Sequence, residues 1–170
     1  NKYNYQYKIL NDETIKWLQS REDEYFDWLL NLWGGYIFKE ELLRKVKNSL
    51  NIHPSYLPYG RGRDPVVWSI RYGFPAGVTL HKITSGVDEG PIFYQEEIKY
   101  EFPITGSELY EKVIDRCWKG FSERWASIRS SNGKGIEQDN THCVRAFRRE
   151  DLIQDNIINL DEDAESRNLV

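Results

Sequence analysis

The sequence predicts an α/β fold in which four strands share one sheet and a long helix covers it. Residues 25–33, YFDWLLNLW, form an apolar run typical of a strand buried on both faces, and residues 49–53 form a second, shorter strand. Residues 76–84 and 91–99 flank a glycine-containing turn, which predicts an antiparallel hairpin. Residues 106–129 carry apolar side chains at helical spacing, so we expect one long amphipathic helix on the sheet.

Residues that favour helix starts support this order of elements. Asn11 is a good cap for a short helix at 12–20, and Thr105 begins a capping box ahead of the long helix. Asp64 followed by Pro65 predicts a cap and a first helical residue. A further amphipathic helix is expected between the first two strands, from the spacing of Phe38, Leu42, Leu43 and Val46.

The composition is typical of one cytoplasmic globular domain. The chain has 170 residues, 39% of them hydrophobic, and a formal net charge of −4. No basic block stands out, so nucleic-acid binding is not expected, and no apolar run reaches the ~18 residues of a membrane span. Cys117 and Cys143 lack metal-type spacing, which predicts reduced thiols and no bound metal. The composition leaves a homodimer open.

One stretch carries the residue types that acyl transfer to an amine requires. Asn51 and His53 lie two apart near the end of a predicted strand, so their side chains point to the same side. Open α/β sheets bind ligands beyond that carboxyl edge, and Asp88 lies in a glycine-flanked turn that can reach back to it. An amide donor, an imidazole base and a carboxylate can polarise a carbonyl and move a proton. An Asn-x-His pair alone, however, is more typical of a structural histidine.

Residues 51–95 as a whole resemble the signature of the formyltransferases that use 10-formyltetrahydrofolate. That signature reads Asn-x-His-x-Ser-x-Leu-Pro, then Arg-Gly with a nearby proline, then Gly-Val-Thr-x-His, then Asp-x-Gly-x-Ile. The matching residues, in order, are Asn51, His53, Ser55, Leu57, Pro58, Arg61, Gly62, Pro65, Gly77, Val78, Thr79, His81, Asp88, Gly90 and Ile92. The resemblance implies a Rossmann-like formyltransferase sheet with a C-terminal antiparallel hairpin and a long covering helix, lacking its first βα units.

The resemblance also implies roles for individual residues. The catalytic triad of the family falls on Asn51, which would hold the formyl oxygen, His53, which would manage the amine proton, and Asp88, which would orient the histidine. The co-substrate is 10-formyltetrahydrofolate, and no metal is implied. Its pterin would lie in a cleft lined by Gly34, Gly35, Tyr36, Ile37, Ser85, Gly86, Val87 and Asp88. The two adjacent glycines of this set would equally suit a simple strand ending.

Other residues near the signature carry open alternatives. Arg61 and Arg63 flank the active-site loop and are candidates for binding a substrate phosphate or carboxylate, although Arg61 would equally suit locking the loop by bonding carbonyl groups. For His81 we favour packing, or a hydrogen bond that supports the site. Cys117 lies in the apolar stripe of the long helix and is expected to be inert.

The expected formyl acceptor is the amine of a nucleotide-linked amino sugar, as in surface polysaccharide synthesis. The segment GRGRDPVVWSI is most similar to the sugar N-formyltransferases, and Asp64 stands where the tRNA enzymes usually have alanine. Methionyl-tRNA and glycinamide ribonucleotide are the alternative acceptors. A non-catalytic relic of the fold that binds folate or a nucleotide is the alternative from another functional class.

We expect a catalytic domain at 1–130, incomplete at its N-terminal end, and a polar extension at 131–170 that begins a further segment. The sequence begins with Asn1 and contains no methionine. We therefore expect residues of a longer protein to be missing at both ends.

Overall fold

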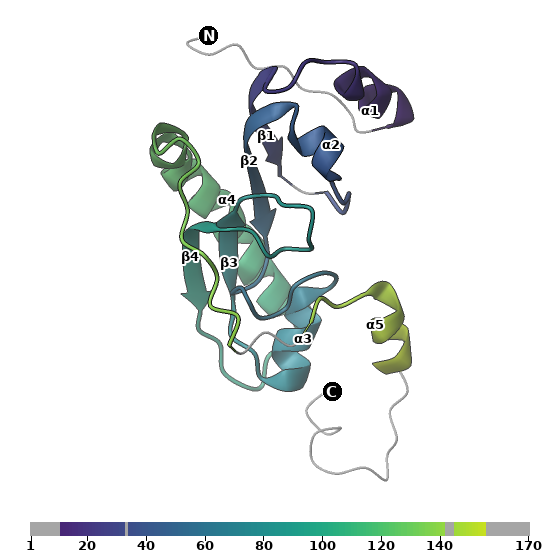
Figure 1. Ribbon diagram of the computed structural model, residues 1–170. Helices are drawn as coiled ribbons and strands as arrows, with labels where there is room; N and C mark the ends of the chain where they lie inside the picture. The colour runs from purple at the N-terminus through teal and green to yellow at the C-terminus, as the bar shows by residue number, and fades with distance from the viewer. Residues whose placement is uncertain (1–10, 33, 142–144, 156–170) are drawn as a thin grey trace.

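The computed structural model describes residues 11–32, 34–141 and 145–155, so Cys143 and the end of the 131–170 extension lie outside the described residues. The elements in chain order are α1 (Asp12–Gln19), β1 (Phe26–Asn31), α2 (Glu40–Leu43), β2 (Val46–His53), α3 (Pro65–Tyr72), β3 (Ala76–His81), β4 (Ile92–Ile98), α4 (Gly106–Ser130) and α5 (Arg149–Asp155). The predicted α/β architecture is confirmed (Figure 1).

The strands form one sheet in the order β1-β2-β3-β4. β1 and β2 run parallel, whereas β3 is antiparallel to both β2 and β4. The predicted antiparallel hairpin is therefore confirmed, with its two strands in the same sheet as β1 and β2. β2 and β3 pair only from Asn51–His81 to His53–Thr79, so the carboxyl ends of these two antiparallel strands overlap.

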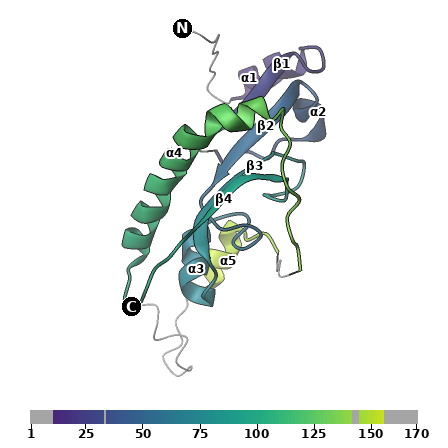
Figure 2. The same cartoon turned by 90° about the vertical axis from the view of Figure 1, so that its left-hand side faces the viewer.

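The long helix α4 packs along one face of the sheet (Figure 2). It begins at Thr105, whose side chain and that of Glu108 form the predicted capping box. Alternation along the strands decides which side chains it covers, since successive residues point to opposite faces. The buried side chains that meet at this interface are Leu50, Ile52, Val78, Leu80, Leu109, Val113 and Cys117. Each such side chain typically contributes about 1.5–3 kcal/mol through burial.

The same alternation turns the polar residues of β2 and β3 toward the opposite face. Asn51 and His53 alternate with Leu50 and Ile52, and His81 follows Leu80. At the β1 end of the molecule, α1 and α2 form a smaller cluster around the buried side chains of Leu18, Phe38 and Leu42 (Figure 1). The face opposite α4 is therefore only partly covered, and it holds the polar ends of the strands.

Two local predictions were wrong, and a third was confirmed only in part. The expected helix at 38–46 is only the single turn α2, because Val46 pairs with Phe26 and starts β2. The apolar spacing there reflects burial in the small cluster, and short apolar runs do not separate helix from strand. β1 is half-buried rather than buried on both faces, because it lies at the edge of the described sheet. Asp64 lies at the N-cap position and Pro65 begins α3, as predicted, but Asp64 adopts a left-handed conformation with φ 54° and its side chain makes no cap hydrogen bond.

The described part of the C-terminal extension packs back onto the catalytic region. Ile136 pairs with Ile92 beside β4, and Phe147 pairs with Gly62 in the loop before α3. The ring of Phe147 stacks on Trp68, with 4.3 Å between ring centroids. These contacts bring α5 and the residues before it to the site, while the domain division at residue 130 stays a prediction. Across the described ranges, every helix is too short or too polar to cross a membrane.

Candidate active site

The register of the sheet places three polar side chains in one row. Asn31, the last residue of β1, pairs with Asn51 of β2, and Asn51 pairs with His81, the last residue of β3. Residues paired across neighbouring strands project from the same face of a sheet, so these side chains meet at one level. His53 lies two residues beyond Asn51 and projects from the same face.

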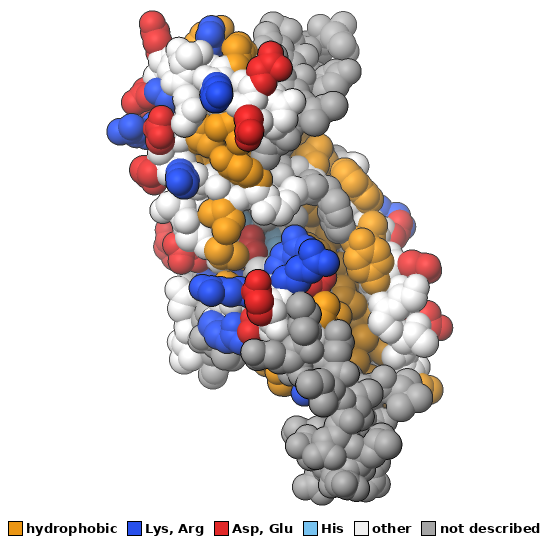
Figure 3. Space-filling model, turned by 90° about the vertical axis from the view of Figure 1, so that its right-hand side faces the viewer, with side chains coloured by type: hydrophobic (Ala, Val, Ile, Leu, Met, Phe, Trp, Pro, Cys, Tyr) orange, Lys and Arg blue, Asp and Glu red, His pale blue; other side chains and the backbone are white. Residues whose placement is uncertain are grey.

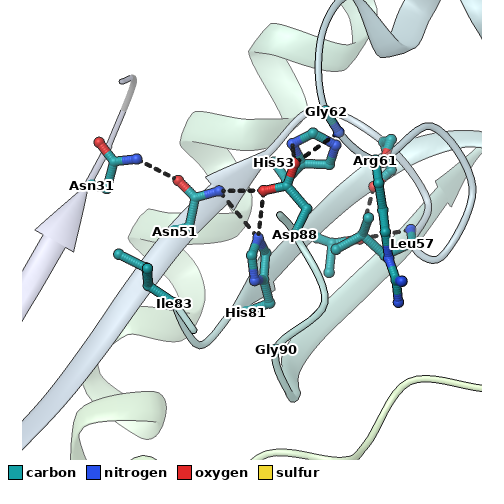
Figure 4. Close-up of polar contacts among 12 residues, drawn as sticks. Asn31, Asn51, His53, Leu57, Arg61, Gly62, His81, Ile83, Asp88 and Gly90 are labelled. Carbon is teal, nitrogen blue, oxygen red and sulfur yellow. Dashed lines mark hydrogen bonds and ion pairs between the residues drawn. The ribbon is translucent and has the colours of Figure 1, made fainter. Parts of the chain in front are cut away.

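Asp88 completes the cluster from the turn between β3 and β4 (Figure 4). One carboxylate oxygen, Oδ2, lies 3.5 Å from His53 Nδ1, and the other, Oδ1, lies 3.5 Å from His81 Nε2. Only 15% of the Asp88 side chain is exposed, and the two histidines are almost fully buried. The structure therefore brings Asn51, His53 and Asp88 together, although 35 positions separate the last two. Their catalytic roles stay predictions.

Hydrogen-bond directions within the cluster follow from groups that can act in only one way. His81 Nδ1 lies 2.8 Å from Lys82 O, which can only accept, so Nδ1 carries the hydrogen and Nε2 is an acceptor. Asn51 Nδ2 then donates to His81 Nε2 at 3.1 Å and to Asp88 Oδ1 at 3.3 Å. Asn51 Oδ1 accepts from Asn31 Nδ2 at 2.8 Å. Both amide hydrogens of Asn51 are therefore engaged within the protein.

His53 is held as a neutral base. Its Nε2 lies 2.9 Å from Gly60 O and must donate to that carbonyl, so the unprotonated Nδ1 faces Asp88. Burial lowers the pKa of His53 below its ordinary value, against the opposing influence of the Asp88 charge. The imidazole is consequently neutral near pH 7 and can accept a proton at Nδ1, where Asp88 would stabilise the resulting cation.

Asp88 is held as a carboxylate in an unusual backbone conformation. Burial alone would raise its pKa, but the positive charge that His53 carries when protonated and the Gly62 N–H, which donates to Oδ2 at 2.9 Å, lower the pKa of Asp88 below its usual range. The residue has a φ of 51°, in the left-handed region. Gln138 supports this turn, because its Nε2 donates to the main-chain oxygens of Asp88 at 2.9 Å and Gly90 at 2.8 Å.

The cluster opens into a cavity of about 1580 Å³, larger than the ~300–1,000 Å³ of a typical small-ligand pocket. The predicted pterin-site residues that line it are Gly34, Gly35, Tyr36, Ile37, Gly86, Val87 and Asp88. Ser85 is exposed and is not among the residues that line the cavity, so its part in the pterin site stays a prediction. Phe38, Ile83 and Thr84 are further lining residues.

The two arginines of the active-site loop have different surroundings. Arg61 is buried, and its Nη2 donates to Gln138 Oε1 at 2.5 Å and Asn140 Oδ1 at 2.6 Å, outside the cavity lining. This placement favours the locking alternative, with side-chain amides in place of the carbonyl groups, while a substrate contact of Arg61 stays a prediction. Arg63 is exposed and does line the cavity.

Comparison with known proteins identifies the family. The sequence profile described as "Formyl transferase" matches residues 28–124, more than half of the chain. The chain belongs to the formyl transferase family. The solved structure of the formyltransferase PseJ from Anoxybacillus kamchatkensis is 30% identical to this chain. Its TM-score is 0.71, and the alignment covers 98% of this chain and 84% of PseJ. PseJ is complexed with UDP-4,6-dideoxy-4-formamido-L-AltNAc and tetrahydrofolate.

Two curated relatives of this member of the formyl transferase family differ in their acceptors. The dTDP-4-amino-4,6-dideoxyglucose formyltransferase of Mycobacterium tuberculosis is 35% identical over 92 residues, covering 54% of this chain and 39% of the relative. The methionyl-tRNA formyltransferase of Thermotoga maritima is 34% identical over 136 residues, covering 78% of this chain and 42% of the relative. The chain thus spans less than half the length of either relative.

The sequence interpretation missed three residues of this candidate site. Asn31 was treated as part of an apolar strand, although a polar residue within YFDWLLNLW was a usable signal. Thr84 lines the cavity, and its Oγ1 is buried without a hydrogen-bond partner in the described ranges. Gln138 lies 50 positions from Asp88, and no local pattern marks it.

Proposed function

We propose that this chain transfers the formyl group of 10-formyltetrahydrofolate to the amine of a nucleotide-linked amino sugar. The observation that carries this proposal is the convergence of Asn51, His53 and Asp88 at one cavity. Complexes of related formyltransferases support the ligand classes, since PseJ holds tetrahydrofolate and a UDP-sugar, and an N-formyltransferase from Helicobacter canadensis holds folinic acid and dTDP-3-aminofucose.

The cavity fits a folate on its chemistry. Main-chain groups of Gly34 and Gly35 line one wall, where the absence of side chains lets a flat ring approach closely. Ile37 is 60% exposed at the same wall and offers an apolar surface to a ring. The unpartnered Thr84 Oγ1 offers a buried hydrogen-bonding group, which is costly unless a ligand or water satisfies it.

The donor supplies an activated formyl carbon, and the residues of the chain would act around it. Asn51 Nδ2 would donate to the formyl oxygen as negative charge grows there. His53 Nδ1 would accept the proton that the attacking amine loses as the new C–N bond forms. Asp88 would stabilise the imidazolium, and the proton would then pass to the folate nitrogen as its bond to the formyl carbon breaks.

An acceptor panel tests the proposal directly. The chain is incubated with 10-formyltetrahydrofolate and a series of UDP- and dTDP-linked amino sugars, and release of tetrahydrofolate is followed. Transfer to an amino sugar with His53-dependent turnover is expected. Turnover only with methionyl-tRNA would favour the second candidate, which the Thermotoga maritima relative supports by its coverage of 78% of this chain.

A binding measurement separates catalysis from a non-catalytic relic. A bound ligand stabilises a folded chain by mass action, by about 2.7 kcal/mol when its concentration is 100 times its Kd. We therefore expect 5-formyltetrahydrofolate to raise the melting temperature. Stabilisation without turnover for every acceptor would favour the relic, and the absence of any shift would count against folate binding.

A further inference from the structure

Unpaired arginines gather at the mouth of the cavity. Within the described ranges, the guanidinium groups of Arg63, Arg148 and Arg149 make no hydrogen bond or ion pair, and all three line the cavity. In contrast, Arg116 pairs with Glu96 and Glu123 outside the cavity. Basic side chains lie beside the hollow in which a histidine is visible (Figure 3). These cations are available to a ligand.

Backbone pairing fixes these arginines relative to each other. Arg63 N donates to Phe147 O at 2.9 Å, and Phe147 N donates to Arg61 O at 2.8 Å. The neighbouring Arg148 therefore leaves the paired segment beside Arg63, and Arg149 begins α5. The stacking of Phe147 on Trp68 anchors the same segment to α3. The arginines of two stretches more than 80 positions apart in the sequence thus lie together at the mouth of the cavity.

Nearby carboxylates determine the net charge at the mouth of the cavity, and so the kind of anion that can bind there. Asp151 is paired with Arg145, at 2.8 and 2.7 Å, and it also accepts from Arg148 N. Arg145 and, to a smaller extent, the charge of Arg148 lower the pKa of Asp151, but within the described residues the Arg148 guanidinium forms no ion pair with it. Asp64 and Glu150 line the cavity as well, without forming an ion pair in the described residues. Asp88, the remaining carboxylate of the lining, is engaged with Asn51 and the Gly62 N–H in the catalytic cluster. Outside that cluster, three arginines without an ion pair face two such carboxylates, and this small local excess of positive charge suits a compact anion better than a long polyanion.

We propose that Arg63, Arg148 and Arg149 form a phosphate-binding site that holds the phosphate end of the formyl acceptor. Planar guanidinium groups bind phosphate oxygens in pairs of parallel hydrogen bonds, which gives both strength and orientation. The location at the mouth would leave the amine end of the acceptor inside the cavity, toward His53. This inference rests on the proposed function, because it assumes that the acceptor enters this cavity.

The test measures binding of inorganic pyrophosphate, UDP, dTDP and ribose 5-phosphate to the chain by titration calorimetry. The variant R148Q/R149Q and the variant R63Q remove the proposed ligands. The control R44Q/K112Q removes two positive charges from exposed residues outside the cavity. We expect each test variant to raise the Kd of phosphate ligands at least about tenfold, since a charged hydrogen bond typically contributes that much. The control should change the Kd less than twofold.

The phosphate ligands also distinguish the acceptor class. Tighter binding of UDP or dTDP than of ribose 5-phosphate indicates the diphosphate of a nucleotide sugar, whereas the reverse order indicates a monophosphate acceptor. Unchanged phosphate binding in the test variants overturns the site. The site is also overturned if the test variants weaken the binding of only one further ligand, the polyglutamate form of 5-formyltetrahydrofolate. That result would assign the arginines to the folate tail. Failure of the monoglutamate folate to bind the unmodified chain would refute the proposed function alone, because the pyrophosphate titration still reports on the arginines.

Discussion

Replacing Asp88 with asparagine tests the proposed proton path most directly. The carboxylate lies 3.5 Å from His53 Nδ1 and would be the counter-ion of the imidazolium that forms during attack. Two unit charges at that distance interact by about 5 kcal/mol at an effective dielectric constant of about 20. An amide retains the size of the side chain but loses this attraction. At about 1.36 kcal/mol per factor of ten, the formyl-transfer rate should fall by up to roughly 10³-fold.

The same variant should change the pH profile in a defined direction. Burial lowers the pKa of His53 and the Asp88 charge opposes it, so the acid limb of the unmodified enzyme should be centred below about 6.5. Removing the charge in D88N lowers the pKa of His53 further. The limb should therefore move to lower pH, because the neutral base persists to lower pH.

Single-turnover formyl transfer, measured between pH 5 and 9, gives both the rate constant and the pH at which the acid limb is centred. E89Q is the matched control, because Glu89 lies in the same turn, is exposed, and loses the same charge. Rates of D88N within about threefold of the unmodified chain, or an acid limb that does not move, would refute the assignment of Asp88 as the partner of His53.

Three further outcomes are expected. Replacing His53 with asparagine should remove the acid limb of the pH profile and lower turnover by roughly 10²–10⁴-fold, with substrate binding nearly unchanged. If the variant keeps both its turnover and the acid limb, His53 is not the base. G62A should lower the melting temperature clearly more than G73A, because both glycines have positive φ but an added Cβ at Gly62 would lie 2.1 Å from Phe147 O and at Gly73 meets nothing. Equal decreases in the melting temperature of G62A and G73A would contradict the clash at Gly62. Burial raises the pKa of Cys117 to about 12, so iodoacetamide at pH 8 should label it only after unfolding, as peptide mass spectrometry would show.

The architecture was largely predictable because strand alternation and helical spacing depend on residues that are close together in the sequence. The hairpin, the capping box at Thr105 and the apolar stripe of α4 all depend on residues within a few positions of one another. The boundary between α2 and β2 was not predictable in this way. Val46 is apolar in either element, and only its pairing with Phe26 on another strand makes it part of the sheet.

The site was predictable only where one segment carried the chemistry. Asn51 and His53 share a strand, so their common direction follows from a two-residue period. The direction of the His53 pKa shift was not predictable, because burial and the Asp88 charge oppose each other and only the fold decides between them. Gln138 and the surroundings of Arg61 depend on the return of a distant segment, which no local spacing indicates.

The hydrogen bonds of Asn51 imply that donor binding rearranges the cluster. Asn31 and His81 fix the amide orientation, and both amide hydrogens are already donated, one to His81 and the longer one, at 3.3 Å, to Asp88. A formyl oxygen can therefore take up an Asn51 hydrogen only by displacing an acceptor, and the longer bond is the weaker one. Asp88 would then lose that donor as His53 gains a proton, so its full charge becomes available to the imidazolium. Binding of 5-formyltetrahydrofolate should accordingly shift the side-chain amide signals of Asn51 in a nitrogen–proton correlation spectrum. If the Asn51 signals stay unchanged while the folate is bound, the formyl oxygen is held by another group.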